Sequence, residues 1–309
     1  MKKLLYIVAM LSPIVASAET LELDDALRAT YSACVGIDEN LSDLKKMAGI
    51  NTAVTAVGTG LGAGALTVGI IKANKDSQAR VKYNDYMSSK PVQVQDRAVA
   101  DAFFTTWEQD PNYGTGAAEY KELRQQSKTL GNWRTGLMAG NTATNIAGAI
   151  IAGNNKVDAD LDTQIKNCRA AVQNLKTSIA RARIEGVDIT EATDIFNACS
   201  GYETVDVSKI NTRGRGAMIS SIVGATTGVA GTATSAVANT ESVRKDDLAT
   251  QGKKTDSDWD KEKNINTAAN VLAGASTAAS GVATVFNATQ ISAIKKVADV
   301  ASKCTGVLK

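Results

Sequence analysis

The four cysteines are the residues of this chain whose type and number point most directly to chemistry. Cys34, Cys168, Cys199 and Cys304 form an even set, and an even set in a chain that begins with an export signal predicts disulfide bonds. Four cysteines allow three pairings. If each half of the chain is an antiparallel hairpin, its two cysteines lie at equal distances from the bend. This geometry favours Cys34 with Cys168 and Cys199 with Cys304.

No other set of residues in the chain has a spacing that indicates catalysis or ligand binding as clearly. The chain has no His, which removes imidazole bases and imidazole metal ligands, and its cysteines lack CxxC spacing. The glycine run at 58–64 does not match a dinucleotide loop, because Ala63 breaks the register and no strand precedes it. The adjacent acids at 38–39 and 246–247 are better explained by helix capping and solvation than by acid–base catalysis. We therefore predict a non-enzymatic chain without catalytic residues, cofactor, metal or small-molecule substrate.

The first 18 residues have the pattern of a secretory signal peptide. Lys2 and Lys3 precede an apolar run over 4–15, which ends at the small-residue cleavage pattern of 16–18. Their removal takes away the formal charge of +2 and leaves a neutral chain. A neutral chain lacks the basic surplus that nucleic-acid binding needs. We expect an exported protein of the periplasm, cell envelope or cell surface, with no nucleic-acid partner.

The chain carries signs of an internal duplication. The pattern Ala-Cys-x-Gly occurs at 33–36 and again at 198–201. Each copy is followed by Ile-Asn-Thr, at 50–52 and 210–212. Repeats of this kind indicate that two similar units stand in tandem. The predicted organisation is a signal peptide (1–18), a first hairpin repeat (19–185) with a tip insertion at about 74–130, and a second hairpin repeat (186–309) with a tip at about 241–263.

Four uncharged stretches rich in Gly, Ala, Thr and Val form the predicted arms of these hairpins. Apolar residues recur in steps of four and three, which indicates a helical seam. Thr and Val also favour strands, and Gly weakens a helix, so strands stay an alternative for single segments. We expect an all-α fold of two tandem antiparallel helical hairpins, packed through Gly/Ala/Thr/Val-rich seams. The stretches are 48–71, 135–155, 216–240 and 264–294, and the seam of the first is Ile50, Val54, Val57, Leu61, Gly64, Val68 and Ile71.

Glycine pairs four residues apart recur in the same stretches. Spacing of this kind lets two helices pack closely, in membranes or in tight bundles. The stretches resemble the glycine-zipper segments of bacterial envelope proteins, but the resemblance covers only these segments and implies no particular function. The pairs are Gly58/Gly62, Gly60/Gly64, Gly136/Gly140 and Gly224/Gly228.

The two tips differ in composition. The second tip is dense in charge and predicts a solvated turn and helix start. The first contains most of the aromatic residues of a chain that has only 5% of them. These aromatics are either a small local core or a candidate interaction tip, since aromatic residues dominate binding hot spots. They are Tyr83, Tyr86, Phe103, Phe104, Trp107, Tyr113 and Tyr120.

Two functions remain open on the sequence. The first is an exported structural or interaction protein, which binds a protein partner or its own copies. The alternative is a membrane-inserting protein, polytopic or pore-forming, because each uncharged stretch reaches the roughly 20 residues needed to cross a bilayer. Of the four, only 55–71 is convincingly apolar by itself, since Asn, Thr and Ser interrupt the others.

Overall fold

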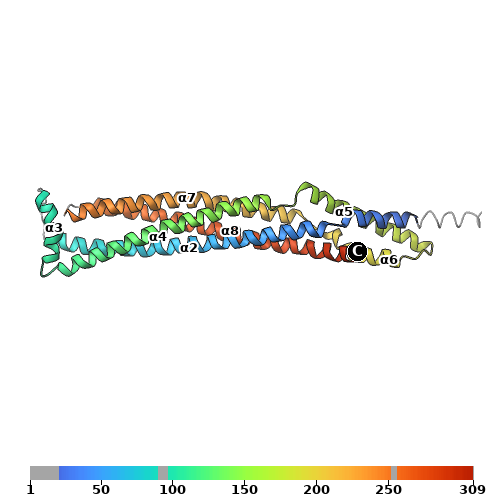
Figure 1. Ribbon diagram of the computed structural model, residues 1–309, viewed down its shortest axis with the longest axis horizontal. Helices are drawn as coiled ribbons and strands as arrows, with labels where there is room; N and C mark the ends of the chain where they lie inside the picture. Colours follow the sequence, from blue (N-terminus) through green and yellow to red (C-terminus); the bar gives the residue numbers. More distant parts are fainter. Residues whose placement is uncertain (1–20, 90–96, 252–255, 309) are drawn as a thin grey trace, which may run out of the picture. The chain divides into compact units, whose positions relative to one another are not determined.

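The computed structural model describes residues 21–89, 97–251 and 256–308, which are helical in their great majority and contain no strand. The predicted all-α fold is confirmed. The signal peptide predicted at 1–18 lies outside the described residues. Residues 21–34 are helical and are followed by α2 (Ile37–Ser89), α3 (Arg97–Gln109), α4 (Gly114–Asn154), α5 (Ala159–Ile184), α6 (Thr190–Cys199), the short 3₁₀ helix η1 (Ser200–Thr204), α7 (Ser208–Thr250) and α8 (Asp256–Leu308) (Figure 1).

Local signals explain where several helices begin and end. Gly36 and Gly186 have φ angles of 86° and 76°, a left-handed conformation that glycine adopts without steric cost. Gly36 separates the helix over 21–34 from α2, and Gly186 follows the end of α5. At the start of α5 the Asp158 side chain accepts a hydrogen bond from the Leu161 N–H at 2.7 Å, which satisfies one otherwise unpaired donor.

The described chain divides into two compact units, and each contains segments from both predicted hairpin repeats. Unit 1 contains residues up to 51, 151–216 and 286 onward, and unit 2 contains 52–150 and 217–285. The compact units therefore do not coincide with the predicted repeats at 19–185 and 186–309. The tandem duplication itself stays a prediction.

Unit 1 has an apolar core of ordinary composition. In α5 and at the end of α8 the apolar residues recur in steps of four and three, which predicts seams over 161–179 and 294–308. These residues are buried in the core together with Tyr202, except Ile179, which is partly buried against it. The two seam predictions are confirmed. The buried seam residues are Leu161, Ile165, Cys168, Val172 and Leu175 in α5, and Ile294, Val297, Ala301, Cys304 and Leu308 in α8.

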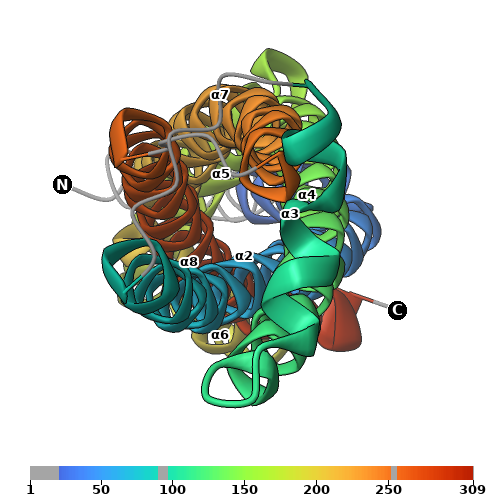
Figure 2. The same cartoon turned by 90° about the vertical axis from the view of Figure 1, so that its left-hand side faces the viewer.

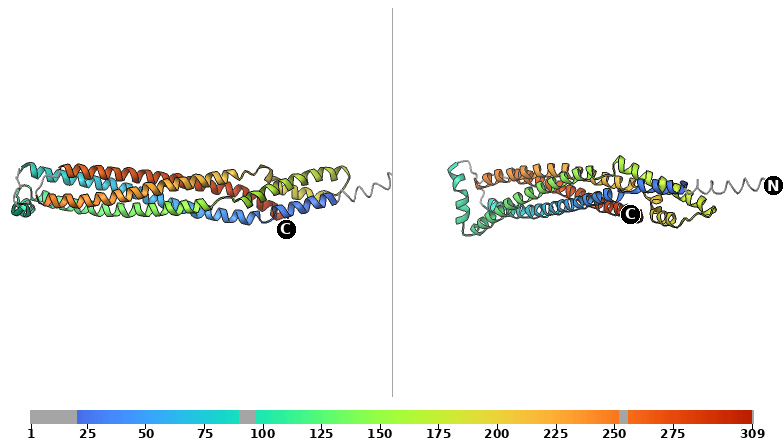
Figure 3. Two further views of the ribbon diagram at one scale, coloured as in Figure 1. Left: turned by 90° about the horizontal axis from the view of Figure 1, so that it is seen from above. Right: turned by 45° about the vertical axis from the view of Figure 1, so that its right-hand side comes forward.

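Unit 2 is a bundle made from parts of α2, α4, α7 and α8. In the end-on view these helices surround a common axis, and α3 lies across the end that carries the tips (Figure 2). Seen from the side, they run lengthwise beside one another (Figure 3). Close approaches between α2 and α4 support the antiparallel arrangement of the first hairpin. Gly58 of α2 lies against Thr144 of α4, and Gly69 further along α2 lies against Arg134.

Glycines in α2 face either a neighbouring helix or open space. A Cβ atom added at Gly62 would lie 2.8 Å from Asn141 Nδ2 and 3.2 Å from Thr277 Cα, whereas one at Gly60 would meet nothing within 4 Å. Gly62 therefore permits close helix packing, as the small-residue spacing predicts. Gly60 contributes no such contact in the described chain.

We expect Gly60→Ala and Gly62→Ala to change stability in opposite directions. Alanine at position 60 should raise the free energy of unfolding by up to about 1 kcal/mol, the helix-propensity gain over glycine. Alanine at position 62 should lower it, by about 1 to 3 kcal/mol, because the helices must move apart. Thermal unfolding in nonionic detergent, followed by circular dichroism, measures both. Equal effects of the two changes would contradict the assigned helix contacts.

Candidate functional site

The interior of unit 2 is made of small and polar residues. Along the uncharged parts of its four helices, the buried side chains are Gly, Ala, Ser, Thr and Asn with a single Met. They bond to one another across helices: Asn141 Nδ2 donates to Ser276 Oγ at 2.8 Å, and Asn145 Nδ2 donates to Ser280 Oγ at 2.8 Å. Interhelical bonds of this kind supply attraction where an apolar core is absent. Besides glycines, the buried residues are Thr55, Ala65, Met138, Asn141, Thr142, Asn145, Ala217, Ser221, Ser235, Ala238, Asn266, Ala269, Ala273, Ser276, Ser280 and Ala283.

The exterior of the same segments is apolar. Residues 52–71, 135–150, 217–240 and 264–285 contain no charged residue, and their large aliphatic side chains include many that point outward. We call this outer surface of unit 2 the aliphatic belt. Its exposed Val and Ile residues are Val57, Ile70, Ile71, Ile146, Ile150, Ile219, Ile222, Val223, Val229, Val237, Val271, Val282 and Val285.

Exposed threonines in the belt have their hydroxyl groups satisfied within their own helices. Thr67 Oγ1 donates to the carbonyl of Ala63 at 3.0 Å, and Thr226 Oγ1 donates to the carbonyl of Ile222 at 2.9 Å. Such bonds to the preceding turn give a hydroxyl a partner without water. The threonines therefore add little unsatisfied polarity to the belt.

This distribution corrects the predicted seam of the first uncharged stretch. Ile50, Val57 and Ile71 are exposed, and none of the seven predicted seam residues is buried. The buried face of α2 in unit 2 instead carries Thr55, Ala65 and the glycines between and beyond them. The spacing was right, but the face was wrong, because the prediction assumed that aliphatic residues point inward.

Two helices of the described chain are long and apolar enough to cross a membrane, by length and composition. They are the segments Leu21–Ser89 and Asp256–Leu308, whose most apolar windows have mean hydropathies of 1.7 and 1.3. Only 28% of each window is buried. Most residues of these apolar windows are therefore exposed or half-buried rather than buried.

A buried network of ion pairs lies beside the belt, toward the tips. It contains three basic and three acidic side chains, contributed by all four helices of unit 2. Lys72 Nζ lies 2.6 Å from Asp76 and 2.9 Å from Glu262, and Arg124 Nε lies 2.6 Å from Asp246. Further pairs join Arg124 to Asp76 and Lys245 to Glu262. The buried members are equal in number and opposite in charge, which is the condition for burying ions. The half-exposed Lys128 adds one further pair, with Asp246 at 3.0 Å.

The tip residues Asp246 and Glu262 were expected to be solvated, and this prediction was wrong. Both are buried members of the ion network. The spacing of charges along each helix does not reveal these partners, because they come from other helices: only Lys72 and Asp76 are close in sequence. The sequence reasoning therefore missed the network.

Burial and charge shift the pKa values of two network members in ways that have physical consequences. Burial alone would raise the pKa of Glu262, but Lys72, Lys245 and Arg124 outweigh it and lower the pKa to about 2. Burial, aided by Arg124, lowers the pKa of Lys245 to about 8, against the opposing influence of Glu262 and Asp76. The Lys245 ammonium also lies 3.2 Å from the centre of the Trp259 ring, a cation–π geometry.

We expect the network to make unit 2 sensitive to acid. Because the pKa of Glu262 is lower in the folded chain than its ordinary value of 4.5, its contribution to stability is fully present above about pH 4.5. It should be lost as the pH falls toward 2, by about 3 kcal/mol. Thermal unfolding measured across this range tests the expectation. Glu262→Gln, which removes the titrating group, should flatten the profile, and an unchanged profile in that variant would contradict the assignment.

The predicted aromatic tip forms a local core. Tyr83, Tyr86, Phe103, Trp107 and Tyr120 are buried, and Phe104 and Tyr113 are partly buried against them. The rings of Tyr86 and Trp107 stack with centroids 4.8 Å apart, and the Trp107 indole N–H donates to the Tyr113 carbonyl at 3.1 Å.

Trp259 and Ala249, from the second tip, join the same cluster. The rings thus stabilise the tip region of unit 2, and an interaction role of this tip stays a prediction.

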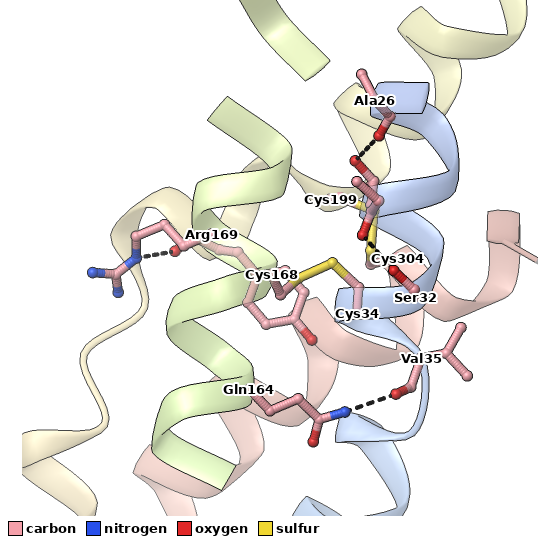
Figure 4. Close-up of a disulfide and its surroundings, with 12 residues drawn as sticks. Ala26, Ser32, Cys34, Val35, Gln164, Cys168, Arg169, Cys199 and Cys304 are labelled. Atoms are coloured by element: carbon pink, nitrogen blue, oxygen red, sulfur yellow. Dashed lines mark hydrogen bonds between the residues drawn. A yellow bond between two sulfur atoms is a disulfide. The ribbon is translucent and has the colours of Figure 1, made fainter. Parts of the chain in front are cut away.

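The predicted disulfides are confirmed. Cys34 is bonded to Cys168 and Cys199 to Cys304, and all four cysteines are buried in the core of unit 1 (Figure 4). Gln164 Nε2, one turn before Cys168, donates to the Val35 carbonyl at 2.9 Å. The first disulfide and this bond together tie the helix over 21–34 to α5.

The fold and these features define an all-α protein with disulfide-linked helices and a bundle that is polar inside and apolar outside. The described residues contain no group of three or more His, Cys, Asp and Glu side chains able to hold a metal ion. No protein-family model, no curated protein and no solved structure matches the chain. Function must therefore be argued from the geometry.

Proposed function

We propose that the chain is an exported, non-enzymatic protein of a bacterial envelope whose unit 2 is embedded in a lipid bilayer. The observation that carries the proposal is the contrast between the two units. In unit 1 aliphatic side chains form the buried core, whereas the uncharged stretches of unit 2 bury no Val, Leu or Ile and expose many Val and Ile residues. Soluble proteins rarely expose large contiguous apolar surfaces, whereas a bilayer is an apolar solvent that such a surface fits.

The polarity of the helices supports this proposal in detail. In hydrocarbon every polar group needs an internal partner, and helices satisfy their backbone groups within the segment. The interior Asn and Ser side chains bond across helices, and the exposed threonines bond to their own helices. The outer surface then offers lipid the side chains of Val, Ile, Ala, Gly and Thr.

The disulfides are consistent with a four-span topology. Four crossings that start from an exported N-terminus place residues 21–46, 156–215 and 295–308 on the outer side and both tips on the inner side. All four cysteines then lie on the outer side, where the oxidising environment permits disulfides. In this proposal the tip region with its ion network faces the cytoplasm.

A second candidate function is association of the chain with its own copies in water. The aliphatic belt favours it too, because a second copy could cover the belt as lipid would. Alkaline carbonate extraction separates the two. A lipid-embedded chain stays in the membrane pellet, whereas a water-soluble assembly is released and is detected as a cross-linked oligomer.

Val57→Asp should prevent membrane retention. Val57 lies near the start of the most apolar stretch, 55–71, and is 57% exposed, and Asp within a spanning helix costs up to about 2.5 to 3.5 kcal/mol. We expect the variant to move from the pellet to the soluble or degraded fraction, while Val57→Thr stays in the pellet. Carbonate extraction with immunoblotting measures this. Equal pellet retention of the two variants, or release of the unaltered chain, would overturn the proposal.

A further inference from the structure

A surface groove lies between α2 and α4 of unit 2, at the end of the aliphatic belt nearest the tips. Its volume is about 580 Å³. Leu61 comes from α2 and the other lining residues come from α4. The lining residues are Leu61, Thr129, Asn132, Trp133, Gly136 and Leu137.

The groove changes from polar to apolar along its length. Thr129 and Asn132 line the end toward the tip, and Leu137 and Leu61 line the end that runs into the belt. From Thr129 to Leu137 the helix advances by about 12 Å. Polar and apolar ends separated by this distance match an amphiphile with a polar head and a hydrocarbon chain.

Trp133 marks the boundary between the two ends. Its side chain is 64% exposed, and it stands just before the uncharged part of α4 that begins at Thr135. Tryptophan is enriched at this level in membrane proteins, where its ring contacts hydrocarbon and its N–H contacts the headgroup region. The other two tryptophans, Trp107 and Trp259, are buried.

Gly136 lines the groove without a side chain to fill it. A Cβ atom added there would meet no other atom within 4 Å, so the glycine is not needed for packing between the described helices. Glycine in a helix costs about 1 kcal/mol relative to alanine. A hydrocarbon chain bound in the space beside Gly136 would give this glycine a role, whereas packing between the protein's own helices gives it none.

We infer that the groove binds one acyl chain of a bilayer phospholipid, with the indole N–H of Trp133 donating to the glycerol or phosphate oxygens. The inference rests on the proposed membrane function and deepens it, because it assigns a specific lipid position on the belt. The groove lies within unit 2, and its polar end faces the same direction as the ion network.

Native mass spectrometry of the full-length chain, extracted in mild detergent and loaded with phosphatidylethanolamine, tests the inference. Gly136→Leu fills the groove and should reduce lipid retention several-fold. The matched control is Gly49→Leu, since Gly49 also has open space around its Cβ position but lies in unit 1. Equal retention in both variants would overturn the inference. Circular dichroism checks that both variants fold.

Tryptophan quenching by brominated lipids provides the second measurement. In phosphatidylcholine vesicles, lipids brominated near the headgroup should quench Trp133 more than lipids brominated near the methyl end, and Trp133→Phe should remove this difference. No quenching by either lipid would overturn the membrane proposal itself. Quenching together with unchanged lipid retention in Gly136→Leu would overturn only the groove. Cross-linking between copies through a cysteine introduced at Asn132, in place of quenching, would show that a second chain covers the surface.

Discussion

Glu262→Ala is expected to lower the free energy of unfolding by about 3 to 5 kcal/mol, because it leaves the buried Lys245 without its acidic partner and Lys72 with only one of its two. The Glu262 carboxylate pairs with both Lys72 and Lys245, whose side chains are fully buried. For a chain of this size the melting temperature should fall by about 10 °C. Thermal unfolding of the purified chain in nonionic detergent, followed by circular dichroism, measures the change.

Glu119→Ala is the matched control for this variant. Glu119 also pairs with a lysine, at 2.6 Å from Lys82, but both side chains are substantially exposed. Exposed ion pairs contribute little because water and salt screen them, so this variant should melt close to the unaltered chain. If Glu262→Ala melted at the same temperature as Glu119→Ala, the buried network would not be a major source of stability.

Removing the second disulfide should have an effect of comparable size. The Cys199–Cys304 bond closes a loop with a sequence separation of 105 residues, and closure of such a loop restricts the unfolded chain by about 4 to 5 kcal/mol in the chain-entropy model. We expect the double variant Cys199→Ser, Cys304→Ser to lose this amount of stability, with unit 1 affected first.

The disulfide prediction has an internal control. The Cys34–Cys168 bond, with a separation of 134 residues, should give a slightly larger loss when it is removed in the same way. Non-reducing peptide mapping of each double variant verifies that the remaining bond is intact. Melting temperatures that do not change after removal of either bond would contradict the expected contribution.

The sequence predicted those parts of the structure that depend on local periodicity and on chain geometry. The helices and both cysteine pairs follow from spacing alone, since a hairpin brings equidistant residues together. The seams of α5 and of the end of α8 were also correct. In these segments the aliphatic face is the buried face, as in most globular proteins.

The sequence failed where interactions between distant segments determine the structure. The helical periodicity shows that Val57 and its neighbours share one face of α2. It does not show whether that face is buried in a core or exposed. The ion network combines residues of four helices, and Arg124 and Asp246 are 122 residues apart. No local pattern indicates that such charges neutralise each other. The composition of each stretch, polar on one face and aliphatic on the other, was the available signal.

The small-residue interior of unit 2 also determines which substitutions the chain can accept. Positions such as Gly62, Asn141 and Ser276 sit where neighbouring helices nearly touch, so larger side chains there separate the helices. Positions such as Ile222 and Val271 face outward and accept many apolar side chains of different size. In a deep mutational scan, both kinds of intolerance should therefore recur with the helical period, but at different positions. Inner positions should reject larger side chains, and outer positions should reject charged ones.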